Sequence, residues 1–308
     1  MLHYIVRRLL QGIVVIFLVT LATFSLMHLA PGDPVQVLVG EAEVSQEVLD
    51  AITRKWGLDR PWYEQYLVWL WNMVRGDFGQ SMVRTGVPVS QMLWEAAPVT
   101  LRLNLYAFAV ALLVAVPVGV VAAVRRYSLF DYGSMVGATL GVALPNFWIG
   151  LMLIILFALT LRWLPSGGSG SWQHYILPVA VLATEQMAVL ARLTRGSTIE
   201  VMNQDFVTTA RAKGLPEGTV IFRHVVRNAL LPVITIIGYR LSFILSGTIV
   251  VETVFAWPGL GRLFVLSIDR LDYQVVQAIA FLLTVLVVIG NLLTDLVYAY
   301  VDPRIRIR

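Results

Sequence analysis

Long apolar runs separated by shorter polar segments set the pattern of this chain. A helix needs about 20 residues to cross roughly 30 Å of hydrocarbon, because each residue adds about 1.5 Å. Since the backbone inside a bilayer must satisfy its own hydrogen bonds, each run of that length is expected to be a helix. Six runs qualify, and they cover residues 9–29, 99–124, 134–161, 176–196, 232–254 and 275–300. The pattern predicts an all-α integral membrane protein whose six spans form one bundle.

The two longest polar segments are expected to contain helices of their own. Residues 30–98 include VSQEVLDAITRKWGLD and PWYEQYLVWLWNMVRG, both typical of short amphipathic helices. The second is rich in Trp and Tyr, which favours the membrane interface; the alternative is that this loop is a passive cap. Residues 197–231 predict two short helices that meet at Gly214, which tolerates the positive φ of a helix C-terminus. Pro216 then suits the first turn of the second helix.

Composition agrees with a membrane protein, and the charge distribution orients it. The chain is 58% hydrophobic and 14% charged, against about 25% charged in soluble domains. If the N-terminus is cytoplasmic, most Lys and Arg residues lie in cytoplasmic segments, and the short outer loops hold only Arg162, Arg262 and Arg270. By the positive-inside rule, both termini are predicted to be cytoplasmic. Residues 30–98 are then extracytoplasmic, and residues 197–231 form a cytoplasmic loop.

Several kinds of catalytic and metal site are not expected. The chain has no Cys, which excludes disulfides and thiolate metal sites, and its His residues form no H-E-x-x-H pattern. Neither lysine lies in a G-x-x-x-x-G-K-[ST] loop, so the chain is not expected to hydrolyse ATP alone. GGSG at 167–170 is superficially similar to the serine motif of rhomboid intramembrane proteases. The last span has no His to serve as a base for Ser169, which favours a flexible Gly-Ser turn.

Small residues and prolines inside the spans predict features of packing. Gly133, Gly137 and Gly141 repeat at four-residue intervals, which indicates a close approach of another helix on that face. Pro117 and Pro145 are expected to kink their helices.

Ionisable residues inside the spans are candidates for a transport path, because charge within a membrane is costly and is functional by default. The alternative is that some of them pair with one another or extend to the interface. Arg102 lies near the end of a span. The candidates within spans are Glu185, Arg240, Glu252 and Asp295.

The cytoplasmic loop carries a resemblance to a known family. Its sequence ARAKG at 210–214, followed by Arg223-His224 and by RNALLP at 227–232, resembles the coupling loop of ABC-importer permeases. Thr208-Thr209-Ala210 stands where that loop usually has Glu-Ala-Ala, and the spacing from Gly214 to Pro232 is longer than in sugar importers. Both departures favour the peptide, nickel and glutathione branch.

The resemblance extends along nearly the whole chain. Further stretches are similar, in the same order, to the first permease subunit of dipeptide and oligopeptide importers. They are PGDP at 31–34, GLDRPWYEQY at 57–66, GDFGQS at 76–81, SWQHYILP at 171–178 and VVETVFAWPGLGRLF at 250–264.

This resemblance implies a six-span bundle of the type I importer kind in a prokaryotic cytoplasmic membrane. It implies four partners besides lipid: a second homologous permease, two cytoplasmic ATPases and an extracytoplasmic binding protein. ATP and Mg would be bound by the ATPases, so no cofactor is expected in this chain, and no nucleic acid is expected as a partner. Peptides are the expected substrate, with glutathione or nickel chelates as alternatives. An ion-driven secondary transporter or a channel is a more distant alternative.

The resemblance also implies roles for three groups of residues. The ATPase-docking turn would be Ala210, Arg211, Ala212, Lys213 and Gly214. The residues supporting it would be Asp205, Arg223, His224, Arg227 and Asn228. The outer gate or binding-protein contact would be Trp257, Pro258, Gly259 and Arg262.

Overall fold

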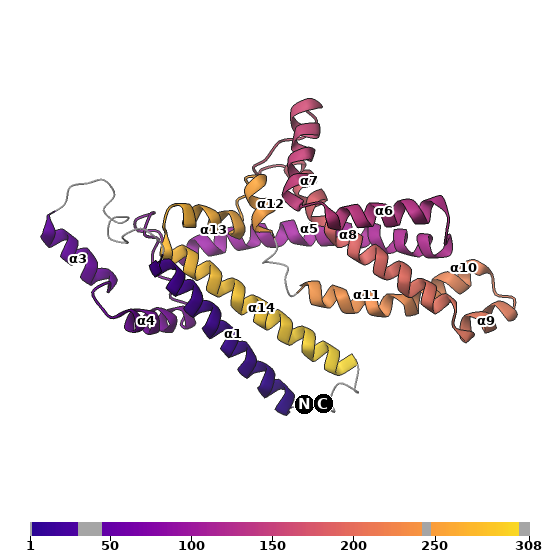
Figure 1. Ribbon diagram of the computed structural model, residues 1–308, viewed down its shortest axis with the longest axis horizontal. Helices are drawn as coiled ribbons and strands as arrows, with labels where there is room; N and C mark the ends of the chain where they lie inside the picture. Colours follow the sequence, from indigo (N-terminus) through magenta and orange to yellow (C-terminus); the bar gives the residue numbers. More distant parts are fainter. Residues whose placement is uncertain (1, 30–44, 242–247, 302–308) are drawn as a thin grey trace. The chain divides into compact units, whose positions relative to one another are not determined.

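The computed structural model describes residues 2–29, 45–241 and 248–301 of the 308-residue chain. Within these residues the secondary structure is helical, apart from one isolated bridge between Gln80 and Pro88 (Figure 1). The chain forms two compact units, Met1–Thr100 with Pro258–Arg308, and Leu101–Trp257. The elements are α1 (Leu2–Leu29), α3 (Gln46–Trp56), α4 (Trp62–Val74), α5 (Val89–Val124), α6 (Leu129–Ala143), α7 (Asn146–Leu153), π-helical η1 (Ile154–Thr160), α8 (Gln173–Met202), α9 (Asp205–Ala212), α10 (Glu217–Thr219), π-helical η2 (Val220–Val225), α11 (Val226–Leu241), α12 (Ile249–Val254), α13 (Leu260–Asp269) and α14 (Tyr273–Val301).

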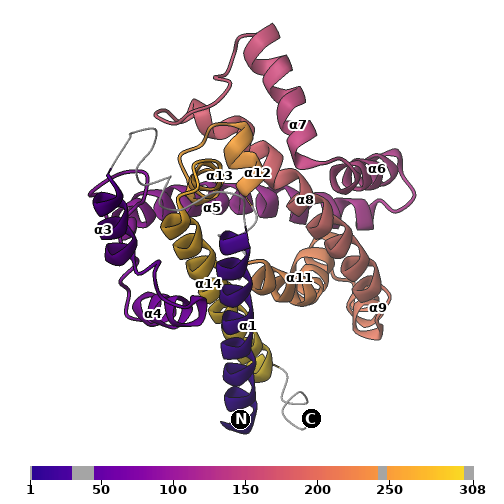
Figure 2. The ribbon, with the colours of Figure 1, turned by 60° about the vertical axis from the view of Figure 1, so that its left-hand side comes forward.

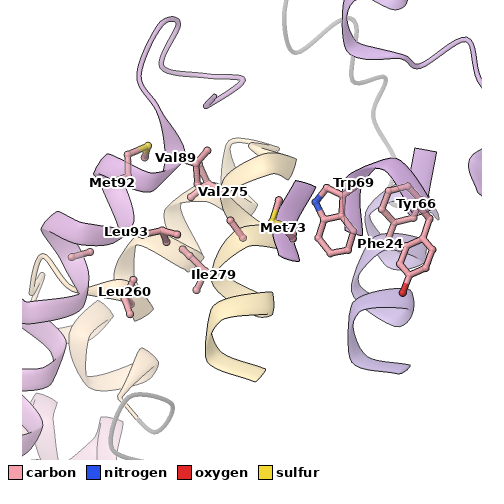
Figure 3. Packing of buried hydrophobic residues seen from close by; sticks show 12 residues of the cluster. Phe24, Tyr66, Trp69, Met73, Val89, Met92, Leu93, Leu260, Val275 and Ile279 are labelled. Atoms are coloured by element: carbon pink, nitrogen blue, oxygen red, sulfur yellow. The ribbon is translucent and has the colours of Figure 1, made fainter. Parts of the chain in front are cut away.

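In the first unit, α1 and α14 lie side by side (Figures 1 and 2). Gly12 permits a close contact, since a Cβ there would lie 2.6 Å from Cγ1 of Val288. Helix α4 packs on α1 through Phe24, Tyr66 and Trp69, whose neighbouring ring centroids are 5.4 to 5.9 Å apart. The same apolar core continues through the start of α5 and through α13 and α14 (Figure 3), and it includes Met73, Val89, Met92, Leu93, Leu260, Val275 and Ile279.

The two helices expected within residues 30–98 are present as α3 and α4. Helix α3 ends at Gly57, which has φ 66° and caps the helix in the left-handed region. Helix α4 buries one aromatic face in the core and leaves Trp62, Leu67 and Trp71 exposed. This exposed face matches the expected interfacial helix, whose position at the membrane surface stays a prediction. The motif PGDP at 31–34 lies outside the described residues.

In the second unit, α8 is the central helix and contacts α6, α7, α11 and α12. The later part of α5 packs on it through small side chains. At Gly119, an added Cβ would meet the carbonyl oxygen of Ala191 and the Cβ of Thr194, both at 2.7 Å. Two helices can approach this closely only where one of them lacks a side chain.

Five described helices are long and apolar enough to cross a membrane, or six spans if one bent pair counts as a single span. The pair is α6 with α7 and η1, whose directions differ by 106°. The break falls at Leu144-Pro145, because Pro145 cannot continue the helix and instead precedes the first residue of α7. The expected kink at Pro145 is thus confirmed as a sharp break. By contrast, α5 continues through Pro117 to Val124.

The ends of several spans differ from the sequence-based expectation. The apolar helix around 232–254 begins at Glu217, because α10, η2 and α11 join without interruption. Residues 242–247 lie outside the described part of the chain, and α12 follows as a separate helix. Helix α8 continues to Met202, beyond the expected end at residue 196.

The glycines of α6 and of the turn at 167–170 differ in their contacts within the described chain. Of the three spaced glycines in α6, only Gly141 contacts another helix, since a Cβ there would lie 3.1 Å from Cγ2 of Thr184. A Cβ at Gly133 or Gly137 would have no described atom within 4 Å. In the turn at 167–170, a Cβ at Gly167 would lie 2.5 Å from the carbonyl oxygen of Phe255, which accepts from Gly168 N–H at 2.8 Å.

Candidate functional site

The segment predicted to be a cytoplasmic loop forms a helix–turn–helix at the end of α8 (Figure 1). The chain turns after Met202, and α9 runs from Asp205 to Ala212. Gly214 has φ 75°, a conformation that favours glycine, and Pro216 caps the start of α10. The predicted pair of helices meeting at Gly214 is therefore confirmed, although the first of them starts later than expected.

The inner face of α9 packs on a small apolar cluster. Val207 and Ala210 are buried against Val201 of α8 and against Val220 and Val225 of η2. This cluster joins α9 to two long helices at once, since η2 continues directly into α11. Ala210, expected in the docking turn, faces this interior contact.

The outer face of the loop is exposed from Arg211 to Gly218. It thus includes four of the five residues expected in the docking turn. Large apolar side chains lie on the same loop: Phe206 is 39% exposed, Leu215 is 38% exposed and Phe222 is 75% exposed. A contiguous exposed apolar surface is typical of a site that binds another protein.

Arg211 is engaged within the loop. Its Nη2 and Nε donate to the two carboxylate oxygens of Glu217 at 2.6 and 3.1 Å, which closes a bidentate ion pair across the Gly214 turn. This hydrogen bond with Glu217 raises the pKa of Arg211, so the guanidinium stays charged. The ion pair connects the two ends of the turn on its exposed side. The apolar cluster holds α9 in place on its buried side.

The residues expected to support the loop have different local roles. Asp205 opens α9, where a carboxylate is favoured by the helix dipole, and its carbonyl oxygen accepts from Thr209 Oγ1 at 2.9 Å. Asn228 Nδ2 donates to the carbonyl oxygen of His224 at 2.7 Å. His224 belongs to the π-helical turn η2 together with Arg223, and π-helical turns often mark functional segments. Arg223 and Arg227 are exposed.

Two of the four candidates for a transport path lie together. Arg240 Nη1 of α11 is 3.5 Å from Glu185 Oε1 of α8, so the expectation that some of these charges pair is confirmed. Asn146, the first residue of α7 after the 106° break, donates to Glu185 Oε2 at 3.3 Å. The side chains of Glu185 and Arg240 are 44% and 33% exposed, so the pair lies at the surface of the unit.

The other two candidates do not join this cluster in the described structure. Glu252 of α12 is fully buried, and its Oε1 accepts at 3.0 Å from Oγ1 of Thr248, the residue that precedes this helix. The side chain of Asp295 lies outside the described residues.

A third ion pair, between Asp131 and Arg195, was missed by the analysis of the sequence. Arg195 Nε and Nη2 donate to the carboxylate oxygens of Asp131 at 2.5 and 2.7 Å, and the Asp131 side chain is only 2% exposed. Asp131 lies in the first turn of α6, where Ser128 caps the helix, and Tyr127 N–H also donates to it at 3.0 Å. The sequence contains a signal that could have predicted this pair. An acidic residue lies in the first turn of one apolar helix, and an arginine interrupts a second apolar helix.

The residues expected at the outer gate belong to the end of one unit and the start of the other. In the second unit, Trp257 is fully buried, with its ring centroid 4.6 Å from that of Tyr175. In the first unit, Pro258, Gly259 and Arg262 line a groove of about 300 Å³ that Arg84 and Glu95 also line.

Comparison with known proteins identifies the family of this chain. Residues 115–307 match the family described as "Binding-protein-dependent transport system inner membrane component". Residues 1–104 match "Binding-prot-dependent transport system membrane comp, N-term". The chain belongs to this permease family. It is therefore a multi-span subunit of an inner-membrane transport system, as its sequence motifs and apolar helices predict.

Two relatives cover the permease almost completely. It is 46% identical over 312 residues to the "Oligopeptide transport system permease protein AppB" of Bacillus subtilis (strain 168), with 98% of each chain covered. It is 41% identical over 306 residues to the "Glutathione transport system permease protein GsiC" of Escherichia coli (strain K12), with 99% of each chain covered. The expected membership of the peptide and glutathione branch is confirmed by these relatives.

No group of three or more His, Asp or Glu residues that could hold a metal ion occurs in the part of the chain that the structure describes.

Proposed function

We propose that this permease is a subunit of an ATP-driven importer of peptides, and that α9 with the turn to Glu217 receives the movement of a cytoplasmic ATPase. The exposed turn on an apolar base is the observation that carries the proposal. A force on α9 reaches α8 through Val201 and reaches α11 through η2, because the buried cluster joins all three. Packed helices move as rigid bodies, so displacement of α9 would tilt two long helices together.

The proposed partners follow from the family and from what the sequence lacks. The family is defined by dependence on a binding protein, and the sequence has no phosphate-binding loop. The complete transporter would contain this chain, a second homologous permease, two ATPases that bind ATP and Mg, and an extracytoplasmic binding protein. The chain itself would hold no cofactor and perform no chemistry.

Peptides are the proposed substrate class. The two relatives are named for oligopeptide and glutathione transport, and glutathione is itself a tripeptide. A shared substrate feature is thus the peptide group with its charged ends.

The cluster of Glu185, Arg240 and Asn146 is the proposed contact along the transport path. An ion pair this exposed on membrane-spanning helices is costly against lipid, so we expect the second permease or a water-filled path to cover it. Broken helices in transporters place polar groups at binding sites, and Asn146 starts a helix after such a break. The ammonium group of a passing peptide could replace Arg240 as the partner of Glu185. Its carboxylate could replace Glu185 as the partner of Arg240.

The groove lined by Pro258, Gly259 and Arg262 is the proposed contact for the binding protein, on the extracytoplasmic side of the membrane. Its two arginines and one glutamate offer charges of both signs to a partner surface. Trp257 is buried, so it would hold the start of the segment 257–262 in place and would not contact the binding protein.

The coupling role is tested by Gly214→Asp, with Gly218→Asp as the matched control in the same exposed loop. Gly214 has a positive φ and Gly218 does not, and a Cβ at either would have no described atom within 4 Å. We expect Gly214→Asp to lower uptake of labelled peptide by at least about 10-fold at normal membrane levels, since it strains and charges the docking turn. Gly218→Asp should keep clearly more of the uptake than Gly214→Asp, since it adds the same charge to the exposed face without straining the backbone.

Normal uptake by Gly214→Asp would refute the coupling role. Uptake that continues without any ATPase subunit and follows a proton or sodium gradient would instead identify a secondary transporter.

A further inference from the structure

The first unit contains a cavity of about 200 Å³ near the end of α1 and the start of α14. It is lined from α1, α4, the segments on either side of α4, and α14. The loop before α4 is fixed, because Gln65 Nε2 donates to the carbonyl oxygens of Leu58 at 3.4 Å and Arg60 at 2.8 Å. The cavity is therefore built into the fold.

Trp69 lies in the wall of this cavity and carries an unused hydrogen-bond donor. The residue is 7% exposed, and its indole N–H has no hydrogen-bond partner among the described residues. Its ring packs on Phe24 and Tyr66, while its nitrogen lies on the side toward Met73, which also lines the cavity (Figure 3). A buried donor without an acceptor costs about 1–3 kcal/mol, so a ligand oxygen here would remove that cost.

Side-chain amides line the same cavity. Gln277, which is only 4% exposed, and Gln274 come from α14, and Asn72 comes from α4. An amide side chain offers both donors and an acceptor, which is the combination needed to pair with a peptide group.

Charged residues of opposite sign complete the lining. Arg60 and Asp77 are both exposed, and one oxygen of Asp77 already accepts from Gly79 N–H at 3.1 Å. Arg60 and the Trp69 indole can only donate, which favours a ligand group that only accepts, namely a carboxylate.

We propose that this cavity binds the carboxyl-terminal residue of a peptide, with the carboxylate held by Arg60 and the Trp69 N–H and the last peptide group held by the amides. The cavity is smaller than the roughly 300–1,000 Å³ of sites that enclose a drug-sized ligand, so the rest of the peptide would extend outside it. The permease then has a peptide site of its own in addition to that of the binding protein. This inference rests on the proposed substrate class.

The experiment measures binding of a labelled tripeptide to the complete transporter in nanodiscs of neutral lipid, without binding protein. Free tripeptide, its C-terminal amide and its N-acetyl form are compared. We expect saturable binding of the free and N-acetylated peptides and roughly 10- to 100-fold weaker binding of the amide, which lacks the carboxylate.

Trp69→Phe keeps an aromatic side chain but removes the N–H together with the pyrrole part of the indole, and it should weaken binding roughly 3- to 10-fold. Trp71→Phe is the control, because Trp71 lies on the same helix, is 56% exposed and does not line the cavity.

Binding that is unaffected by amidation and by Trp69→Phe would overturn the proposal. Absence of binding, in a transporter that takes up the same peptide once the binding protein is added, would also overturn it and leave the proposed function intact. Absence of uptake of any peptide by that complete system would overturn the proposed function. Peptide binding that still depends on the carboxylate and on Trp69 in such a system would support the proposed binding site in the cavity.

Discussion

The second unit contains two bidentate arginine–carboxylate pairs with the same chemistry and opposite surroundings. Arg195 and Asp131 join α8 to the start of α6, and the Asp131 side chain is almost completely buried. Arg211 and Glu217 close the turn at Gly214, with side chains that are 40% and 55% exposed. A buried carboxylate depends on its partner because water cannot replace it, whereas an exposed pair competes with solvent and contributes little. The first pair therefore stabilises the fold, and the second sets the shape of a surface.

The largest expected effect is at the buried pair. Arg195→Ala leaves Asp131 without its main partner, and breaking a pair of this kind costs about 3–5 kcal/mol. We expect the lower end of that range, since Arg195 is 24% exposed. The melting temperature of the purified protein in detergent should fall clearly, with less folded protein in the membrane.

The matched control removes both charges at once, as Asp131→Leu with Arg195→Met. This double variant should be more stable than Arg195→Ala, because no unpaired charge is left. A single variant that melts like the wild type would contradict the structural role of the pair.

The half-exposed pair of Glu185 and Arg240 gives an intermediate case. Glu185→Gln should change the melting temperature little, because pairs at this exposure contribute about 1 kcal/mol or less. If the pair lies on the transport path, the same variant should reduce peptide uptake several-fold at normal membrane levels. Thr184→Ser, one residue away on α8, is the control and should leave uptake unchanged. Normal uptake by Glu185→Gln would place the pair outside the path.

The smallest effect on stability is expected at the exposed pair. Arg211→Glu should leave the melting temperature unchanged, yet lower uptake because repulsion from Glu217 opens the turn. Exchanging both residues, as Arg211→Glu with Glu217→Arg, restores an ion pair of reversed direction and should recover part of the uptake. A melting temperature as low as that of Arg195→Ala would show that the two pairs do not differ as proposed. No recovery in the double variant would assign Arg211 a direct contact with the ATPase.

Most of the helical architecture was predictable from local pattern. A run such as 99–124 can only be a membrane helix, because hydrocarbon satisfies none of its backbone polar groups. The helix–turn–helix at Gly214 was also predictable, since glycine and proline act on the backbone within a few residues. The family was evident from motifs spread along the chain and is confirmed by relatives that match over nearly its full length.

The placement of individual side chains was less predictable, because it depends on which helices meet. Ala210 is part of the docking motif in the sequence, yet it faces the apolar base formed by Val201 and Val220. Gly133 and Gly141 look equivalent at four-residue spacing, but only Gly141 lies against α8. The period of a helix places residues on a face without saying what covers that face.

The sequence by itself determined that this chain is a membrane-embedded permease, which segments are helices, and where the turn at Gly214 lies. These properties follow from hydrophobic length, backbone preferences and motifs, all of which act over short stretches of chain. Only the tertiary structure decided which charges pair. Asp131 and Arg195 are 64 residues apart in the sequence and Glu185 and Arg240 are 55 apart, and local pattern marks these residues as charges in apolar helices without saying which of them pair. An ion pair forms where packing brings two helices together, so its partners are a property of the fold rather than of either segment.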